Sequence, residues 1–207
     1  MSMQHYKPSE SIAAAVLAGG KNKRMAGLNK SFVKIKDTTI IDRTVDLLKT
    51  IFSEIIIVTN SPQDYVVYEG ECSIVTDKIK DIGPLGGIFT ALSQTSKPSV
   101  FFVACDMPFL HNELILHQLT CFKERDCDAL VPRIGVLVEP LHAIYKKDLA
   151  NNIQRFVKEN MDYSIKTFLE TIAVCYWDLE DNSFHRNIFR NLNTIDDVNE
   201  INDRLCG

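Results

Sequence analysis

The stretch IAAAVLAGG, residues 12–20, decides the fold class. Its first seven residues are all apolar, and two glycines follow them directly. A short, continuous apolar run that ends in glycine is typical of a buried parallel strand, because a strand covered on both faces needs no polar side. The sequence therefore predicts a buried strand at residues 12–18, followed by a glycine-rich loop.

Strands and helices alternate along the rest of the chain. Further apolar, strand-like runs lie at residues 55–59, 72–76, 100–105, 129–132, 141–145 and 172–177. Amphipathic or apolar helical segments are predicted at residues 41–52, 85–94, 110–121, 149–157 and 194–205. This alternation predicts an α/β fold with a single doubly wound, mostly parallel sheet and helices on both faces. Ligands of such sheets bind at the carboxyl ends of the strands.

The composition limits the possible functions. The 207 residues have a mass of 23.5 kDa, and we expect a flexible N-terminus at 1–10 and a single domain at 11–207. With 45% hydrophobic and 24% charged residues, the chain is neither disordered nor a coiled coil. A net charge of −4 gives no sign of nucleic-acid binding. The longest apolar run has seven residues, whereas a membrane span needs about 20, so we expect no membrane association.

The six cysteines form no C-x-x-C pair. Several lie inside apolar segments, where a free thiol acts as a small hydrophobic side chain. We interpret them as buried thiols rather than disulfides or zinc ligands. This interpretation predicts a reducing compartment and hence a cytoplasmic protein.

The loop after the first strand is strongly basic. The segment 21–36 contains six Lys or Arg residues, among them Arg24 and Lys30, and no Asp or Glu. Glycine backbone N–H groups and concentrated positive charge are typical of a phosphate-binding site. Neither the P-loop pattern nor the G-x-G-x-x-G pattern matches. A solvated basic loop without a ligand is the structural alternative, but a position directly after the first strand favours a phosphate role.

A carboxylate follows the fourth predicted strand. Asp106 comes directly after the apolar residues 100–105, at the edge where the sheet should bind its ligand. Mg²⁺ usually takes one or two carboxylates and completes its shell with phosphate oxygens and water. Asp106 could instead only cap the following turn. Together with the basic loop, it predicts a site for a phosphate and a metal ion.

Several motifs resemble a known family in the same order along the chain. They are Leu17-Ala18-Gly19-Gly20 with Arg24-Met25 and Lys30, Asp77 before Gly83-Pro84-Leu85-Gly86-Gly87, Cys105-Asp106-Met107-Pro108, Glu139-Pro140-Leu141-His142-Ala143, and Asn191-Leu192-Asn193-Thr194. With these motifs the sequence resembles the molybdenum cofactor guanylyltransferases. The resemblance implies a nucleotidyltransferase-type, Rossmann-like sheet and a single nucleotidyltransferase domain at residues 11–207. The resemblance extends from residue 12 to about residue 198.

The resemblance implies a role for each matched position. The nucleotide contacts are Leu17, Ala18, Gly19, Lys30, Asp77 and Asp106. Among them, Asp77 recognises guanine, and Asp106 also binds Mg²⁺. The catalytic group comprises Arg24, Lys30 and Asp106, the first two facing the phosphates. The segments 139–143 and 191–194 line the pterin side of the cleft.

The activity implied by the resemblance is a Mg²⁺-dependent transfer of GMP from GTP to the phosphate of molybdopterin. Other cofactor-biosynthesis proteins and the molybdoenzymes that receive the product are the implied protein partners. Ala26, Asn29 and Ile195 depart from the family pattern, which usually has Gly, Asp and Pro there. Two alternatives stay open: a cytidylyltransferase for the same or another phosphorylated acceptor, and a catalytically silent nucleotide-binding protein that delivers the cofactor.

Overall fold

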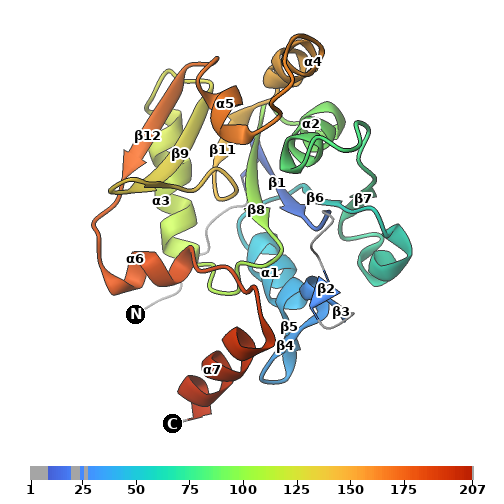
Figure 1. The fold of residues 1–207 in the computed structure, drawn as a ribbon, viewed down its shortest axis with the longest axis vertical. Coiled ribbons are helices and arrows are strands. Elements are labelled where there is room, and N and C mark those ends of the chain that lie inside the picture. The colour runs from blue at the N-terminus through green and yellow to red at the C-terminus, as the bar shows by residue number, and fades with distance from the viewer. Residues whose placement is uncertain (1–8, 20–23, 26–27, 207) are drawn as a thin grey trace.

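A computed structural model describes residues 9–19, 24–25 and 28–206, and Figure 1 shows how their helices and strands are arranged. Within this part of the chain, eight strands form one sheet in the order β10-β9-β11-β8-β1-β6-β7, with β12 also paired to β9. Their bounds are β1 (Ile12–Leu17), β6 (Ile55–Val58), β7 (Ser73–Val75), β8 (Ser99–Ala104), β9 (Ala129–Ile134), β10 (Leu137–Val138), β11 (Ile144–Lys146) and β12 (Val174–Asp178). All the predicted strands are present.

The centre of the sheet is parallel, as predicted. Strand β1 pairs in parallel with both β6 and β8, β6 pairs in parallel with β7, and β9 with β12. Strands β10 and β11 are antiparallel to their neighbours. Leu17 is level with Val58 on one side and with Ala104 on the other. The chain segments that follow these three residues therefore emerge side by side at one edge, which we call the carboxyl edge.

Helices cover both faces of the sheet (Figure 1). Their bounds are α1 (Ile40–Lys49), α2 (Pro84–Gln94), α3 (Asn112–Lys123), α4 (Leu149–Glu159), α5 (Ile165–Leu169), α6 (Ser183–Ile188) and α7 (Ile195–Cys206). Successive residues of β1 face opposite sides: Val16 packs in the core with α1, α3 and α6, whereas Leu17 packs in the core with α2, α4 and α5. The two cores confirm the doubly wound α/β fold.

Short elements interrupt the segment that the sequence predicts as a loop. Strands β2 (Arg24–Met25) and β3 (Leu28–Asn29) form a small antiparallel pair. The 3₁₀ helix η1 (Lys30–Phe32) and the pair β4 (Lys34–Ile35) and β5 (Thr38–Thr39) follow. The prediction of a plain loop after the first strand was therefore wrong in part, because two-residue strands are too short to show a repeating pattern of polarity.

Helix α7 packs away from the main sheet, beside β4 and β5 (Figure 1). Val198 and Ile201 share a small buried core with Ile35, Ile40 and Leu192. This core attaches the end of the chain to the basic segment near its beginning.

The start of the described chain is attached to the connection between α1 and β6. Ser9 N–H donates to the Ile51 carbonyl at 2.7 Å, and Ser9 is bridged to Phe52. Residues 1–8 of the predicted flexible N-terminus lie outside the described residues. None of the helices in the described ranges is long and apolar enough to cross a membrane.

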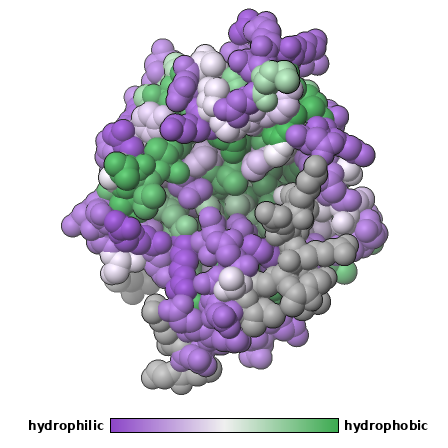
Figure 2. All heavy atoms as spheres, in the orientation of Figure 1, coloured by the Kyte–Doolittle hydropathy of each residue, from purple (hydrophilic) through white to green (hydrophobic). Residues whose placement is uncertain are grey.

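The tip of the β9–β10 hairpin exposes apolar side chains. Val136 is 95% exposed and Leu137 is 57% exposed. In Figure 2 hydrophobic residues gather over this hairpin, whereas the surface over α6 and α7 is mostly hydrophilic. The hairpin leads directly into Glu139, so this apolar surface borders the carboxyl edge.

Candidate active site

The segment Leu17–Gly19 is fixed at the carboxyl edge by its neighbours on both sides. Ala18 N–H donates to the Val58 carbonyl at 2.8 Å, and the Leu17 carbonyl accepts from Cys105 N–H at 3.2 Å. Ala18 is fully buried, and Gly19 is partly exposed. The backbone is therefore held in place where the predicted nucleotide contacts begin.

Lys30 is a buried cation at this edge. It is only 9% exposed, and its ammonium group donates to Asn193 Oδ1 at 3.2 Å. Arg24, the other predicted phosphate ligand, pairs through its backbone with Asn29, but its side chain lies outside the described part of the structure. The structure thus locates one of the two predicted cations.

Asn29 stabilises the turn that presents Lys30. Its Oδ1 accepts from Ser31 N–H at 3.1 Å and so caps η1. Its Nδ2 donates to the Tyr65 hydroxyl at 3.2 Å, and that hydroxyl donates to Ser31 Oγ at 2.8 Å. Asparagine thus serves as a cap where the family usually has aspartate, and it adds a donor that aspartate lacks. The departure at this position is compatible with a formed phosphate-binding turn.

Asp106 lies beside Lys30 and beside the C-terminal segment. Burial raises the pKa of the Asp106 carboxyl, and the positive charge of Lys30 acts in the opposite direction. The Asp106 carbonyl accepts from Leu192 N–H at 2.9 Å. The structure therefore brings Lys30, Asp106 and the segment 191–194 together, although they are far apart in sequence.

Asp77 faces the end of the first strand from the loop after β7. Its Oδ2 accepts from Asn60 Nδ2 at 2.9 Å, and its buried Oδ1 has no hydrogen-bond partner among the residues that the structure describes. A Cβ atom at Gly87 would lie 3.7 Å from Asp77 Oδ1 and 2.9 Å from Leu17 Cδ2. Asp77, Leu17 and Gly87 therefore meet, and one carboxylate oxygen is available there to accept a hydrogen bond. Asn60 follows the carboxyl end of β6 and is a further candidate site residue, which the sequence alone did not indicate.

Backbone geometry and close packing explain the residue types of the Gly-Pro-Leu-Gly-Gly motif at residues 83–87. Gly83 precedes α2 with φ 61° and ψ −151°, a backbone conformation that other residues avoid. Pro84 then occupies the first turn of the helix, where no N–H is needed. A Cβ atom at Gly86 would lie 2.6 Å from the Ile79 carbonyl oxygen. The motif therefore allows α2 to begin close to the loop that carries Asp77.

Within the segment 139–143, Glu139 lies near the candidate site and His142 lies in the core. Burial, together with the charge of Asp106, raises the pKa of Glu139 to about 7. His142 is fully buried, with its ring edge-on to Phe101 and Phe189, so it belongs to the core rather than to the cleft. Glu139 is therefore a second carboxyl group near Asp106, and only its place in the family-like motif indicated it.

The donor set suits a metal ion that shares most of its ligands with phosphate. No group of three His, Cys, Asp or Glu side chains in the described residues is arranged to hold a metal ion. Asp106 offers one carboxylate, and Glu139 lies close enough for the charge of Asp106 to contribute to the raised pKa of Glu139. Mg²⁺ needs no more protein ligands than this when phosphate oxygens are present.

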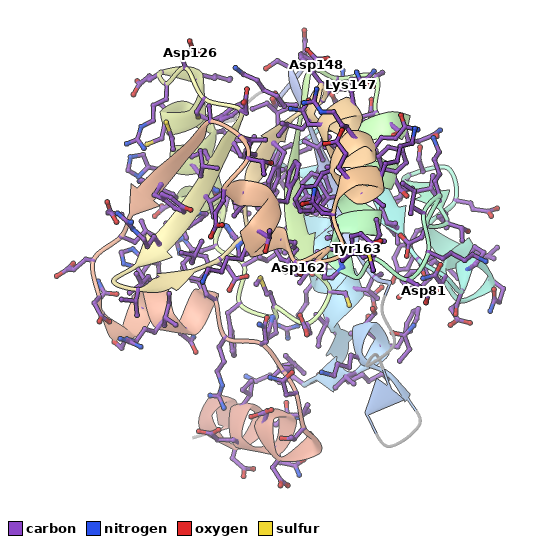
Figure 3. The ribbon with its side chains drawn as sticks, turned by 45° about the horizontal axis from the view of Figure 1, so that its top comes forward. Asp81, Asp126, Lys147, Asp148, Asp162 and Tyr163 are labelled. Atoms are coloured by element: carbon purple, nitrogen blue, oxygen red, sulfur yellow. The ribbon has the colours of Figure 1, made fainter. Side chains whose placement is uncertain are left out.

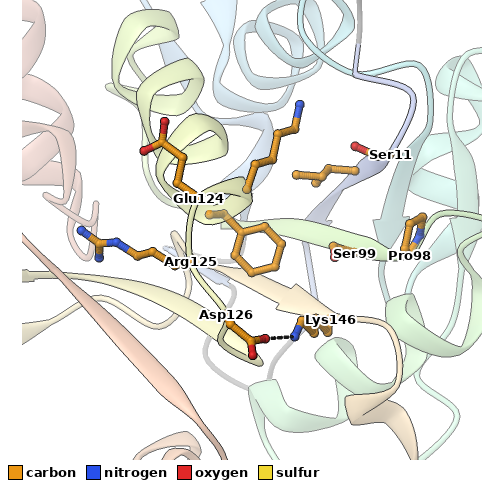
Figure 4. A pocket seen from close by; sticks show the side chains of 10 residues that line it. Ser11, Pro98, Ser99, Glu124, Arg125, Asp126 and Lys146 are labelled. Atoms are coloured by element: carbon orange, nitrogen blue, oxygen red, sulfur yellow. Dashed lines mark hydrogen bonds and ion pairs between the residues drawn. The ribbon is translucent and has the colours of Figure 1, made fainter.

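A surface hollow of about 500 Å³ lies at the opposite end of the strands. It is lined by Ile12 and Ser99, where β1 and β8 begin, and by Asp126 and Lys146, which are paired at 3.4 Å (Figure 4). Figure 3 likewise shows Asp126 and Lys147 at the end of the molecule away from α7. The hollow is therefore separate from the carboxyl edge and from the predicted site residues.

The chain is similar in sequence to known proteins over most of its length. Residues 14–174 match the model of the MobA-like NTP transferase domain. The molybdenum cofactor guanylyltransferase of Syntrophotalea carbinolica is 34% identical over 189 residues, covering 89% of this chain and 88% of that protein.

Two solved structures share the fold. Molybdopterin-guanine dinucleotide biosynthesis protein A from Archaeoglobus fulgidus has a TM-score of 0.76 and 24% identity, covering 94% of this chain and 98% of that one. A structure from Aquifex aeolicus VF5 has a TM-score of 0.71 and 28% identity, covering 90% and 95%. By its sequence match over most of its length, the chain belongs to the molybdenum cofactor guanylyltransferase family, within the MobA-like NTP transferases.

Proposed function

We propose that this chain transfers GMP from GTP to the phosphate of molybdopterin, forming molybdopterin guanine dinucleotide and pyrophosphate. The names of its relatives support these substrates. Within the structure, the supporting observation is the buried Lys30 ammonium, held 3.2 Å from Asn193 Oδ1 and next to Asp106. A fixed cation beside a buried carboxylate suits a polyphosphate that arrives with its own counter-ion.

The base preference rests on Asp77. Guanine presents two adjacent donors, N1–H and the 2-amino group, whereas cytosine presents one amino group at its pairing edge. The unpartnered Oδ1 of Asp77 can accept from such donors while Oδ2 remains bonded to Asn60. This arrangement favours GTP over CTP.

The reaction needs no nucleophile from the protein. An oxygen of the molybdopterin phosphate, already anionic at neutral pH, forms a bond to the α-phosphorus of GTP. The bond from that phosphorus to the bridging oxygen breaks, and pyrophosphate leaves with the electron pair. Lys30 and Arg24 would offset the negative charge that grows on the phosphates, and a rigid site would keep the reacting groups aligned.

Asp106 is the proposed ligand of Mg²⁺, with Glu139 as the neighbouring carboxyl group. When bound, Mg²⁺ would polarise the phosphate oxygens and neutralise part of their charge. Asp106 also holds the C-terminal segment through its carbonyl, so the same residue connects metal binding to the position of Asn193.

The test is a transfer assay with GTP labelled at the α-phosphate, purified molybdopterin and Mg²⁺. The expected result is label attached to the pterin and one pyrophosphate released per transfer. The same assay with CTP measures base preference, and a chelator measures the need for a divalent cation. Preferred use of CTP would support the cytidylyltransferase alternative. GTP binding without transfer would support a silent nucleotide-binding protein.

A further inference from the structure

The segment that presents Asn193 to Lys30 has no regular structure of its own. Residues 190–194 lie between α6 and α7, and Asn193 is exposed. An exposed asparagine in an irregular segment has several side-chain and backbone positions available. Its contact with the Lys30 ammonium therefore requires that the backbone of this segment be fixed from elsewhere.

Asp197 provides such a fixed point through one carboxylate oxygen. Its Oδ2 accepts from Asn193 N–H at 2.9 Å and from Thr194 N–H at 2.8 Å. The Thr194 hydroxyl also donates to that oxygen at 3.0 Å, and Thr194 Oγ1 accepts from Asp197 N–H at 3.2 Å. These reciprocal bonds form a capping box at the beginning of α7. The box therefore fixes the backbone at Asn193 as well as the end of the helix.

The Asp197 side chain is itself held in place. Arg190 Nη2 lies 3.5 Å from Asp197 Oδ1 and also pairs with Glu200. The hydrogen bonds from Asn193 and Thr194 hold the pKa of Asp197 below its usual value. Val198 and Ile201 attach the same helix to the core that contains Leu192. The contacts thus run from α7 through Asp197 to Asn193 and then to Lys30.

We propose that Asp197 is a positioning residue for the phosphate site: by fixing the backbone at Asn193, it holds the Lys30 ammonium in place beside Asp106. The inference rests on the proposed function for what the site binds. It assigns Asp197 a role beyond stabilising its helix, because a misplaced cation would stabilise the transition state less well.

Asp196 offers a matched control. It is the preceding residue, carries the same charge in the same first helical turn and is exposed. Asp196→Ala and Asp197→Ala therefore remove the same favourable charge from the N-terminus of α7. Only the second substitution removes the acceptor of the Asn193 and Thr194 N–H groups.

The experiment compares kcat and KM of these two variants in the labelled transfer assay, with thermal unfolding as a check on folding. We expect Asp197→Ala to lower kcat about tenfold or more, and Asp196→Ala to leave it within about twofold. The KM for molybdopterin should change little. Asp197→Glu should restore most of the activity, because glutamate also completes a capping box at this position.

A double mutant tests whether Asp197 acts through Asn193. If it does, Asp197→Ala should have little further effect in an Asn193→Ala background, since the contact to Lys30 is already lost. Equal losses of kcat in Asp196→Ala and Asp197→Ala would overturn the proposal. Full additivity of the effects of Asp197→Ala and Asn193→Ala on kcat would also overturn it.

Binding of GTP gives a readout that does not need transfer. In isothermal titration, Asp197→Ala should weaken GTP binding about threefold or more relative to Asp196→Ala, again without adding to Asn193→Ala. A wild-type protein that binds GTP but transfers no GMP would contradict the proposed function alone. Equal GTP affinities of Asp196→Ala and Asp197→Ala would then contradict the positioning role alone.

Discussion

The buried imidazole of His142 should make this protein lose stability in acid, and His142→Phe should remove that loss. The side chain is fully buried, and its ring centroid lies 5.0 Å from that of Phe101 and 5.1 Å from that of Phe189. Within the described part of the chain, neither ring nitrogen has a hydrogen-bond partner. Burial lowers the pKa of His142 from 6.5 to about 4. The charged form is therefore strongly disfavoured in the folded state.

The sign and size of the effect follow from these two pKa values. Below pH 6.5 the unfolded chain binds a proton at His142, whereas the folded chain does so only near pH 4. The stability contributed by the neutral ring is thus complete above pH 6.5 and is lost progressively as the pH falls towards 4. Each pH unit in this window is worth about 1.4 kcal/mol, so the total is about 3 kcal/mol.

Urea unfolding at several pH values between 7 and 4 measures this difference. As the pH falls from 7 to 4, the free energy of unfolding of His142→Phe should rise by about 3 kcal/mol relative to that of wild type. Any constant difference that the larger ring causes at pH 7 does not affect this change. His117→Phe is the control, because His117 also lies edge-on to an aromatic ring, Trp177, but is exposed. Parallel pH curves for wild type and His142→Phe would refute the reasoning.

Substitutions at the carboxyl edge should affect different steps. Asp106→Ala and Lys30→Ala should each lower the transfer rate on the order of 10²–10³-fold, as measured by the labelled assay. Circular dichroism should show that the fold survives. Near-wild-type activity would contradict the roles of these two residues. Asp77→Asn should reduce the preference for GTP over CTP roughly tenfold, as the ratio of kcat/KM values, because a charge-assisted acceptor is lost. Gly87→Ala should weaken GTP binding in isothermal titration, because the alanine Cβ would lie 2.9 Å from Leu17 Cδ2. Unchanged affinity would contradict a nucleotide pocket beside Leu17 and Gly87.

Much of the fold could be predicted because its strands are encoded locally. The continuous apolar run at residues 12–18 and the β-branched run at 55–59 can be buried only in a sheet that is covered on both faces. The glycines at 83, 86 and 87 likewise follow from local backbone and packing needs. The small β2–β3 and β4–β5 pairs were not predicted, because they are too short to carry a pattern.

The sequence indicates candidate site residues where they follow a strand or share the basic loop after the first strand. Asp106 comes after a buried strand, and parallel topology then places it at the carboxyl edge. Asn60 was missed, and Glu139 was indicated only by its place in a family-like motif, because neither residue type nor spacing distinguishes them from ordinary turn and loop residues. Their significance depends on Asp77 and Asp106, which are near them only in space.

The sequence by itself determined the sheet, the glycine-rich loop and the acid at the end of β8, since each depends on residues adjacent in the chain. Only the tertiary structure decided which groups act together at the carboxyl edge. Lys30 and Asn193 are 163 positions apart, and their contact depends on how α7 packs against the segment after β3. Such a contact is set by the packing of distant elements, and no local pattern of side chains encodes it.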